Sequence, residues 1–132
     1  MGFDLYNELQ RKQRELSASL KQLRENGSAL AEAERDYKIT LRVAVLRLKE
    51  EGHPATLISL IVYGEKDFAE KIFKRDIAKT IYEANQEAIQ TTKLQLRLIE
   101  AQINREWGAS DVNWITWKSD ESYSFWKRES NH

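Results

Sequence analysis

Apolar residues recur every seven positions over the first fifty residues of the chain. The first series consists of Leu9, Leu16, Leu23, Leu30, Tyr37 and Ala44. A second series, four residues further on in the same repeat, consists of Tyr6, Leu20, Leu41 and Leu48. Two such series place apolar side chains along one stripe of a helix. The pattern therefore predicts a helix from about residue 4 to residue 51.

One short segment interrupts this pattern, because Asn26, Gly27 and Ser28 follow one another. Asn and Gly often end helices, and Ser is a good N-cap, so two separate helices are an alternative. The seven-residue spacing nevertheless keeps its phase across the interruption, whereas a loop would normally reset it. We therefore expect one long helix with a kink or weak point at Gly27.

The end of this predicted helix is apolar nearly all round. Its apolar positions are Ile39, Leu41, Val43, Ala44, Val45, Leu46 and Leu48. A helix of this kind is covered on more than one side. We therefore expect this stretch to lie at a junction with more than one neighbouring helix.

Gly52 and Pro54 mark the clearest break in the chain. Gly can adopt the left-handed conformation that closes a helix, and Pro suits the first position of the next one. The following segment, residues 55–63, predicts a two-turn helix that ends at Gly64, although a short buried strand is an alternative. The apolar side chains that we expect this segment to present are Leu57, Ile58, Ile61 and Val62.

A second long helix is predicted over residues 66–107, where no Gly or Pro occurs and Gly108 provides a stop. The positions of its apolar face recur every three or four residues: Ala69, Phe73, Ile77, Ile81, Ala84, Ala88, Thr92, Leu96, Ile99 and Ile103. The expected fold is all-α: a long antiparallel helical hairpin with a short connecting helix. This hairpin domain would span residues 1–108.

A hairpin of two helices buries little apolar surface, and pairing two hairpins into a bundle would cover more. We therefore also expect a homo-oligomer. The leucines predicted to form its interface are Leu9, Leu16, Leu23, Leu30, Leu41 and Leu48. The alternative for the same leucines is a seam with the second long helix of the same chain.

The last 24 residues, 109–132, form a segment of different composition that is rich in aromatic residues. Trp and Tyr often anchor protein interfaces. We expect this C-terminal tail either to bind a partner or to pack on the chain's own bundle. The predicted partner-binding residues are Trp114, Trp117, Tyr123, Phe125 and Trp126.

The composition excludes several classes of protein. The chain has 132 residues, which is the size of one domain, and its 21 basic residues equal its 21 acidic ones. A globally basic nucleic-acid binder is therefore excluded. The absence of Cys excludes a disulfide framework and a zinc–thiolate site. The sequence shows no signal peptide and no apolar stretch long enough to span a membrane, so we expect a cytoplasmic protein.

Catalytic and metal-binding motifs are absent from the sequence. There are two His residues, His53 and His132, and neither belongs to a metal-binding motif. The scarcity of His argues against a catalytic triad, and the isolated glycines argue against a phosphate-binding loop. We expect no catalytic residue, no metal and no cofactor, and therefore a protein that is not an enzyme.

Four basic residues follow one another along the first predicted helix: Arg35, Lys38, Arg42 and Lys49. They could bind phosphate groups of a nucleotide or a nucleic acid. Because the net charge is zero and acidic residues lie close by, we favour a solvated stripe, or salt bridges to acidic residues on the facing helix.

Four stretches together resemble short helical proteins encoded by tailed phages and prophages of Gram-positive bacteria. They are ERDYKI (34–39), LISLIVYG (57–64), FKRDIA (73–78) and KLQLRLIEAQINREW (93–107). The resemblance covers about residues 30–108 and carries no catalytic residues with it. It implies the cytoplasm of an infected bacterium, where small phage proteins commonly bind host or phage proteins.

The function expected from these observations is that of a non-enzymatic binding protein. It would occlude or redirect a host defence protein or a protein that processes nucleic acids. One alternative is a nucleic-acid-binding accessory of phage recombination. Another is a sponge that sequesters a nucleotide signal in a pocket at an oligomer interface.

Overall fold

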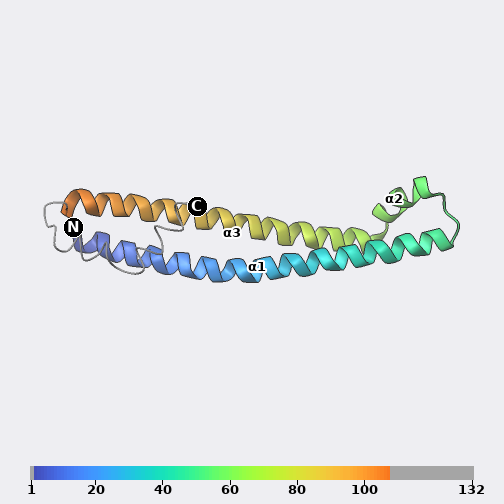
Figure 1. The fold of residues 1–132 in the computed structure, drawn as a ribbon, viewed down its shortest axis with the longest axis horizontal. Coiled ribbons are helices and arrows are strands. Elements are labelled where there is room, and N and C mark those ends of the chain that lie inside the picture. The colour runs from blue at the N-terminus through green and yellow to red at the C-terminus, as the bar shows by residue number, and fades with distance from the viewer. Residues whose placement is uncertain (1, 108–132) are drawn as a thin grey trace. The chain divides into compact units, whose positions relative to one another are not determined.

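The computed structural model describes residues 2–107 of the chain, and three helices make up nearly all of that part (Figure 1). Helix α1 covers Gly2–Glu50, α2 covers Ala55–Tyr63 and α3 covers Lys66–Trp107. No strand occurs between residues 2 and 107. Helices α1 and α3 pack together as a helical hairpin, which confirms the predicted all-α fold and its short connecting helix. The predicted homo-oligomer stays a prediction.

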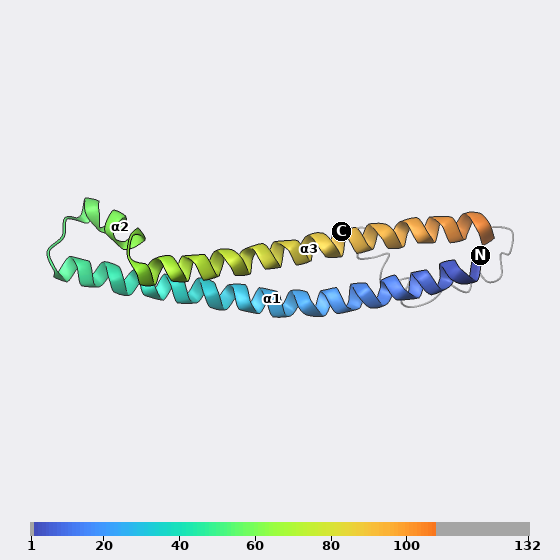
Figure 2. The ribbon, with the colours of Figure 1, turned by 180° about the vertical axis from the view of Figure 1, so that it is seen from behind.

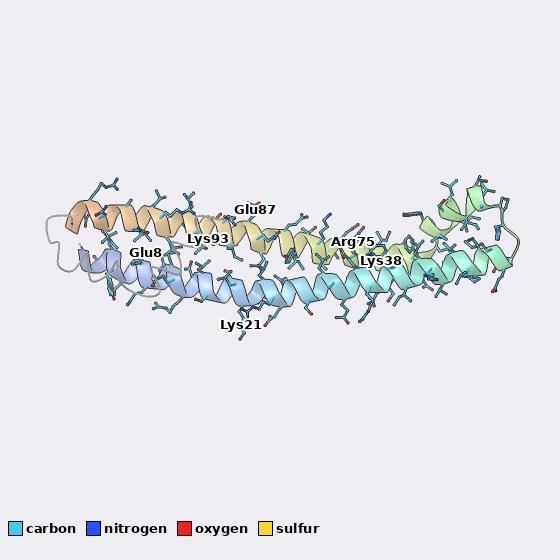
Figure 3. The ribbon with its side chains drawn as sticks, in the orientation of Figure 1. Glu8, Lys21, Lys38, Arg75, Glu87 and Lys93 are labelled. Carbon is cyan, nitrogen blue, oxygen red and sulfur yellow. The ribbon has the colours of Figure 1, made fainter. Side chains whose placement is uncertain are left out.

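The described residues fall into two compact units. In the first unit, residues 2–20 of α1 lie beside residues 88–107 of α3 (Figure 1). The second unit comprises residues 21–87, and it contains the rest of α1, all of α2 and the first half of α3. Charged side chains that belong to no core, such as Lys21 and Glu87 in the second unit, point outwards (Figure 3).

The first unit has a narrow buried seam between its two helices. Helix α1 contributes two leucines of the predicted series, and α3 contributes the other buried side chains of this seam. The buried residues are Leu9, Leu16, Ile89, Thr92, Leu96 and Ile103. The leucines assigned to an oligomer interface in this part of the chain are therefore used inside one chain.

The second predicted series is not part of this seam, because Tyr6 and Leu20 are exposed. The half-buried positions beside the seam include Lys12 and Ser19, three residues after each buried leucine, and Gln13, four residues after Leu9. Further along α1 the pattern changes, since Leu48 is buried and Leu41 half-buried, four residues after Ala44 and Tyr37. A seven-residue repeat falls about 20° behind a straight helix with each repeat. Positions four residues ahead therefore rotate into the buried stripe as the helix proceeds.

The second unit confirms that α1 continues without a break through Gly27. Within this unit the Asn26 side-chain amide donates a hydrogen bond of 3.0 Å to the side-chain oxygen of Asn85 on α3. A polar pair at a coiled-coil seam fixes the register and orientation of the two helices at some cost in stability. The ring of Tyr82 lies against Gly27.

Replacing Gly27 by Ala should stabilise the protein by about 0.5–1 kcal/mol, because Gly is costly in the middle of a helix. A Cβ atom at this position would lie 3.4 Å from Cε2 of Tyr82, which is ordinary contact. Thermal unfolding of Gly27→Ala tests the expectation. Gly27→Leu serves as the comparison, because its larger side chain must displace the Tyr82 ring and should lower the melting temperature.

The predicted break after α1 is confirmed in detail. Gly52 has a φ of 87°, in the left-handed region that favours glycine. The N–H groups of Gly52 and His53 donate hydrogen bonds to the carbonyls of Lys49 and Leu48, at 3.1 and 3.2 Å. This pair of bonds closes the helix as a Schellman motif. Pro54 occupies the N-cap of α2, one position earlier than predicted.

Candidate protein-interaction surface

Helix α2 is anchored on a small apolar core in the second unit. Ile58 and Val62, one turn apart, are buried and point into this core. The cluster around them combines buried residues of all three helices: Ala44, Leu48, Ile58, Val62 and Phe68. Figure 1 and Figure 2 both show α2 beside the last turns of α1. The end of α1 therefore meets both α2 and α3 through Ala44 and Leu48, as predicted. The expectation that the whole apolar stretch is covered was wrong, because Ile39, Val43 and Leu46 are exposed.

Aromatic contacts tie α2 to its neighbours. Phe68 is 1% exposed, and its ring meets that of Tyr63 edge-on, with centroids 5.1 Å apart. Tyr37 on α1 approaches Phe68 from another helix, at 6.3 Å. The guanidinium of Arg75 lies over the Tyr37 ring, 4.8 Å from its centroid, in cation–π geometry. Such contacts add to the area burial of the rings and fix their orientation.

One arginine links the two loops that flank α2. Arg47, in the last turn of α1, forms ion pairs with Glu51 before α2 and with Glu65 after it. The hydrogen bond to the Glu65 carboxylate raises the pKa of Arg47, so it stays charged. Both ion pairs are exposed and contribute little to stability, so the anchor of α2 is its buried face.

The opposite face of α2 is apolar and exposed. Leu57, Leu60 and Tyr63 are 46%, 73% and 61% exposed. No charged residue occurs between positions 54 and 63, although 32% of the chain is charged. We refer to these three residues as the α2 face. An exposed apolar group of this kind is typical of an interaction site.

The sequence analysis grouped Leu57 with Ile58, Ile61 and Val62 as the apolar side chains that this helix presents, and the structure divides the group, because Leu57 is exposed. The residues that do pack inwards are Ile58 and Val62, with Ile61 half-buried. A helix of nine residues that lies on one neighbouring surface can bury only one of its sides. The spacing places Leu57, Leu60 and Tyr63 on one side of α2 and Ile58 and Val62 on the other, but both sides are apolar, so the spacing does not say which side is buried.

The four basic residues predicted as possible phosphate ligands lie along the exposed side of α1. All of Arg35, Lys38, Arg42 and Lys49 are exposed. Arg35 forms ion pairs with Asp36 at 3.3 Å and Glu32 at 3.7 Å, both on its own helix and not on the facing one as the salt-bridge interpretation expected. Lys38 is labelled in Figure 3, near Arg75 of α3. Their role stays a prediction.

The remaining predicted residues divide between loop, seam and tail. His53 lies in the loop before α2, and its Nε2 atom is 3.3 Å from a carboxylate oxygen of Glu51. Leu23 and Leu30, like Leu41, are half-buried on α1. The five aromatic residues assigned to partner binding in the tail lie outside the described residues. In the part of the chain that the structure describes, no group of three or more His, Cys, Asp or Glu could hold a metal ion.

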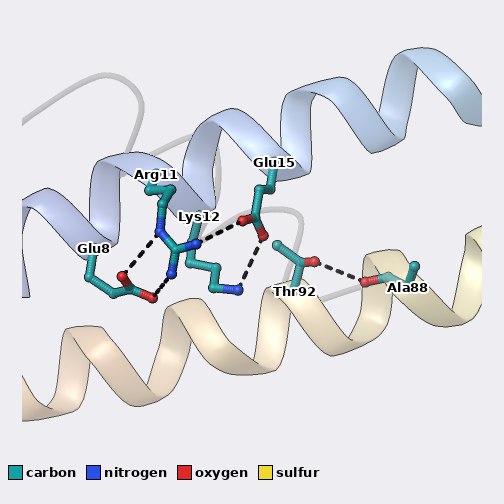
Figure 4. Close-up of polar contacts among 6 residues, drawn as sticks. All are labelled: Glu8, Arg11, Lys12, Glu15, Ala88 and Thr92. Carbon is teal, nitrogen blue, oxygen red and sulfur yellow. Dashed lines mark hydrogen bonds and ion pairs between the residues drawn. The ribbon is translucent and has the colours of Figure 1, made fainter.

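The first unit carries a polar network on the surface of α1 (Figure 4). Arg11 donates to Glu8 at 2.6 Å and reaches Glu15 at 3.5 Å, while Lys12 contacts Glu15 at 3.1 Å. The bond from Arg11 lowers the pKa of the Glu8 carboxyl. Ionised Glu8 therefore contributes stability that is lost as the pH falls through this lowered pKa. Exposed ion pairs contribute little, so this network does not indicate a binding site.

A shallow hollow lies between α1 and α3 in the second unit. It has a volume of about 200 Å³ and is lined by Asn26, Ala29, Lys74, Ile77, Ala78 and Ile81. The two alanines create the hollow, because their side chains are too short to fill the space between the helices. Ligand sites for drug-sized molecules usually measure ~300–1,000 Å³, so this hollow is small for such a ligand.

Comparisons of the chain with protein-family models, with curated proteins and with solved structures gave no match. None of the helices between residues 2 and 107 has the length and apolar character needed to cross a membrane. The functional argument therefore depends on the surfaces described above.

Proposed function

We propose that this chain is a non-enzymatic protein-binding module and that the α2 face is its docking surface. The observation that carries the proposal is the orientation of α2, which has one apolar side buried and the other exposed. The helix presents Leu57, Leu60 and Tyr63 to solvent while Ile58 and Val62 fix its other side in the core. Burying the exposed parts of these three side chains on a partner would gain several kcal/mol before the costs of association.

The rigidity of this surface supports a protein partner. Helix α2 is anchored by Ile58 and Val62 in the core, so a partner would meet a backbone that is already ordered. Tyr63 joins an apolar ring to a polar hydroxyl, a combination that is enriched at the centres of interfaces. A nucleic acid would instead need cations at the contact, and the α2 face has none.

The resemblance to helical proteins of phages and prophages supplies the biological setting of this proposal. In that setting the partner is a host defence protein or a protein that processes nucleic acids. A surface without catalytic groups acts by occlusion, because the bound module covers the partner's own site. Because α2 is a two-turn helix with an exposed apolar side, it is suited to insertion into an apolar groove on such a partner.

The experiment is affinity capture from lysate of a Gram-positive bacterium, with nuclease treatment, using the full chain and two variants. Leu60→Asp places a charge at the centre of the α2 face and should remove the captured protein. Leu94→Asp is the matched control: Leu94 is 55% exposed on α3. A captured protein that resists nuclease and high salt, and that is lost only with Leu60→Asp, supports the proposal.

Two other results would contradict it. Loss of the captured material on nuclease treatment would favour the nucleic-acid-binding alternative. A chain that ends at residue 108 tests the aromatic tail. If this truncated chain loses the partner while Leu60→Asp keeps it, then the docking surface is the tail and not α2.

A further inference from the structure

We infer that the outer side of α1, near its C-terminal end, is a second docking surface that binds an amphipathic helix with acidic residues along one edge. The surface consists of Ile39, Val43 and Leu46 together with the basic residues beside them, and we call it the α1 outer face. It belongs to the second unit and shares no residue with the α2 face. The inference therefore does not rest on the proposed function.

The α1 outer face contains an apolar row on the side of the helix that the chain leaves uncovered. Ile39, Val43 and Leu46 are 56%, 61% and 52% exposed. At about 100° per residue, these three residues fall within a sector of about 60°. This sector lies roughly opposite the buried residues Ala44 and Leu48. Spacings of four and three residues are those of the a and d positions of a coiled coil, so the row can pack against one further helix.

Basic residues follow one edge of this row at intervals of seven. With Val43 at an a position, Arg35, Arg42 and Lys49 occupy three successive g positions, which flank the row on one side. Residues 37–49 contain four basic residues and no acidic one, although the whole chain has equal numbers of each. Charged residues at the e and g positions set which partner a coiled-coil helix accepts. This edge therefore selects a partner that carries negative charge.

Most of the cations along this edge have no counter-charge within the described residues. Arg35 already forms ion pairs with carboxylates of its own helix. Between residues 2 and 107, however, no carboxylate forms an ion pair with Arg42 or Lys49, nor with Lys38 on the same side of the helix. A partner helix with Glu or Asp beside this edge would supply those ion pairs. The apolar row and the charge pattern thus point to the same occupant, an acidic amphipathic helix.

A second copy of this chain does not fit the α1 outer face. In a parallel pair, each g residue faces an e residue of the other helix, which sets Arg42 against Arg47 of the second copy. In an antiparallel pair, the g residues face one another, and all of them are basic. Both orientations bring like charges together, and this is unfavourable.

The two ends of the row argue against an extended anionic surface such as a membrane or a nucleic acid. Asp36 and Glu50, seven residues before and after Val43, lie in line with the row and place a carboxylate at each end. They limit the favourable contact to residues 37–49, which span ~18 Å of helix. About three turns of a partner helix fit this length, whereas a membrane or a nucleic acid would also cover the two carboxylates.

The small size of the α1 outer face predicts weak and reversible binding. Its three apolar side chains offer less area than the ~800 Å² per partner of a standard stable interface. We therefore expect a dissociation constant in the micromolar range, with a contribution from charge that falls as salt is added.

Two synthetic peptides, each three heptads long, serve as probes. Both have Ile and Leu at their a and d positions and a fluorophore at one end. The acidic peptide has Glu at every e and g position, and the basic peptide has Lys there, so like charges keep each peptide from pairing with itself at neutral pH. Fluorescence anisotropy with the full chain should show at least about tenfold tighter binding of the acidic peptide at low salt, and a smaller difference at high salt.

Three variants test which residues bind the peptide. Replacing Arg42 and Lys49 together by Glu should reverse the preference, so that the basic peptide binds more tightly. Both residues are exposed, so the fold should not change. Val43→Asp should abolish binding of the acidic peptide. Leu94→Asp, the matched control at a 55% exposed position of α3, should leave binding unchanged.

Several results would overturn the inference. Equal binding of the two peptides, or binding of neither, would show that the surface does not select an acidic helix, as would an unchanged preference in the charge-reversed variant. Binding to phosphatidylglycerol vesicles or to duplex DNA without binding of the acidic peptide would assign the surface to one of those partners instead. Leu60→Asp should leave peptide binding unchanged, so failure here and failure of the proposed function are distinguishable.

Discussion

Replacing Phe68 by Ala should lower the free energy of unfolding by about 3–5 kcal/mol, the range for large buried aromatic residues. Phe68 is among the most buried side chains of the described residues, and its ring contacts those of Tyr63 and Tyr37. Removing it leaves a cavity at the point where the three helices of the second unit meet. Urea unfolding, followed by circular dichroism, measures the loss.

Phe73→Ala is the matched control, because it makes the same change on the same helix at a position that is 65% exposed. At concentrations where the chain is monomeric, it should cost less than ~1 kcal/mol. Hydrogen exchange gives a second readout, since Phe68→Ala should release the amides of α2 first. Equal losses for the two variants would mean that α2 is not anchored by this core. The rigidity on which the proposed function depends would then be lost.

Replacing Leu16 by Ala should cost about 2–5 kcal/mol, whereas Leu20→Ala should cost less than ~1 kcal/mol. Both leucines belong to the seven-residue pattern on α1, but Leu16 is 9% exposed and Leu20 is 39% exposed. The physical reason is that Leu16 fills space in the seam with α3, while Leu20 leaves no cavity when it is shortened. Thermal and urea unfolding of the two variants provide the comparison.

If Leu20→Ala lowers the free energy of unfolding more than Leu16→Ala does, then Leu20, a member of the second series, lies in the seam. Equal and large effects would indicate that a second chain covers Leu20. The pair of variants therefore also tests whether the first unit is complete as a single chain. Measurements at two protein concentrations separate these cases, because only association makes the stability depend on concentration.

The sequence determined the helices of this protein and most of their ends. Spacing of apolar residues identified all three helices, and Gly52 and Gly64 marked where α1 and α2 end. These features depend on local physics: the period of the helix, the left-handed conformation of glycine and the fixed φ of proline. The continuity of α1 through Gly27 was also predictable, because the seven-residue repeat has the same phase before and after this residue.

Only the tertiary structure decided which apolar residues are buried. The sequence contains more apolar positions than three helices can cover, so pattern alone could not separate Ile58 from Leu57 or Leu16 from Leu20. Burial depends on the angle at which each helix faces its neighbour, and the repeat drifts against the helix by about 20° in every seven residues. The α2 face consists of residues that this packing leaves exposed, and it became visible as a candidate contact surface once the core was placed.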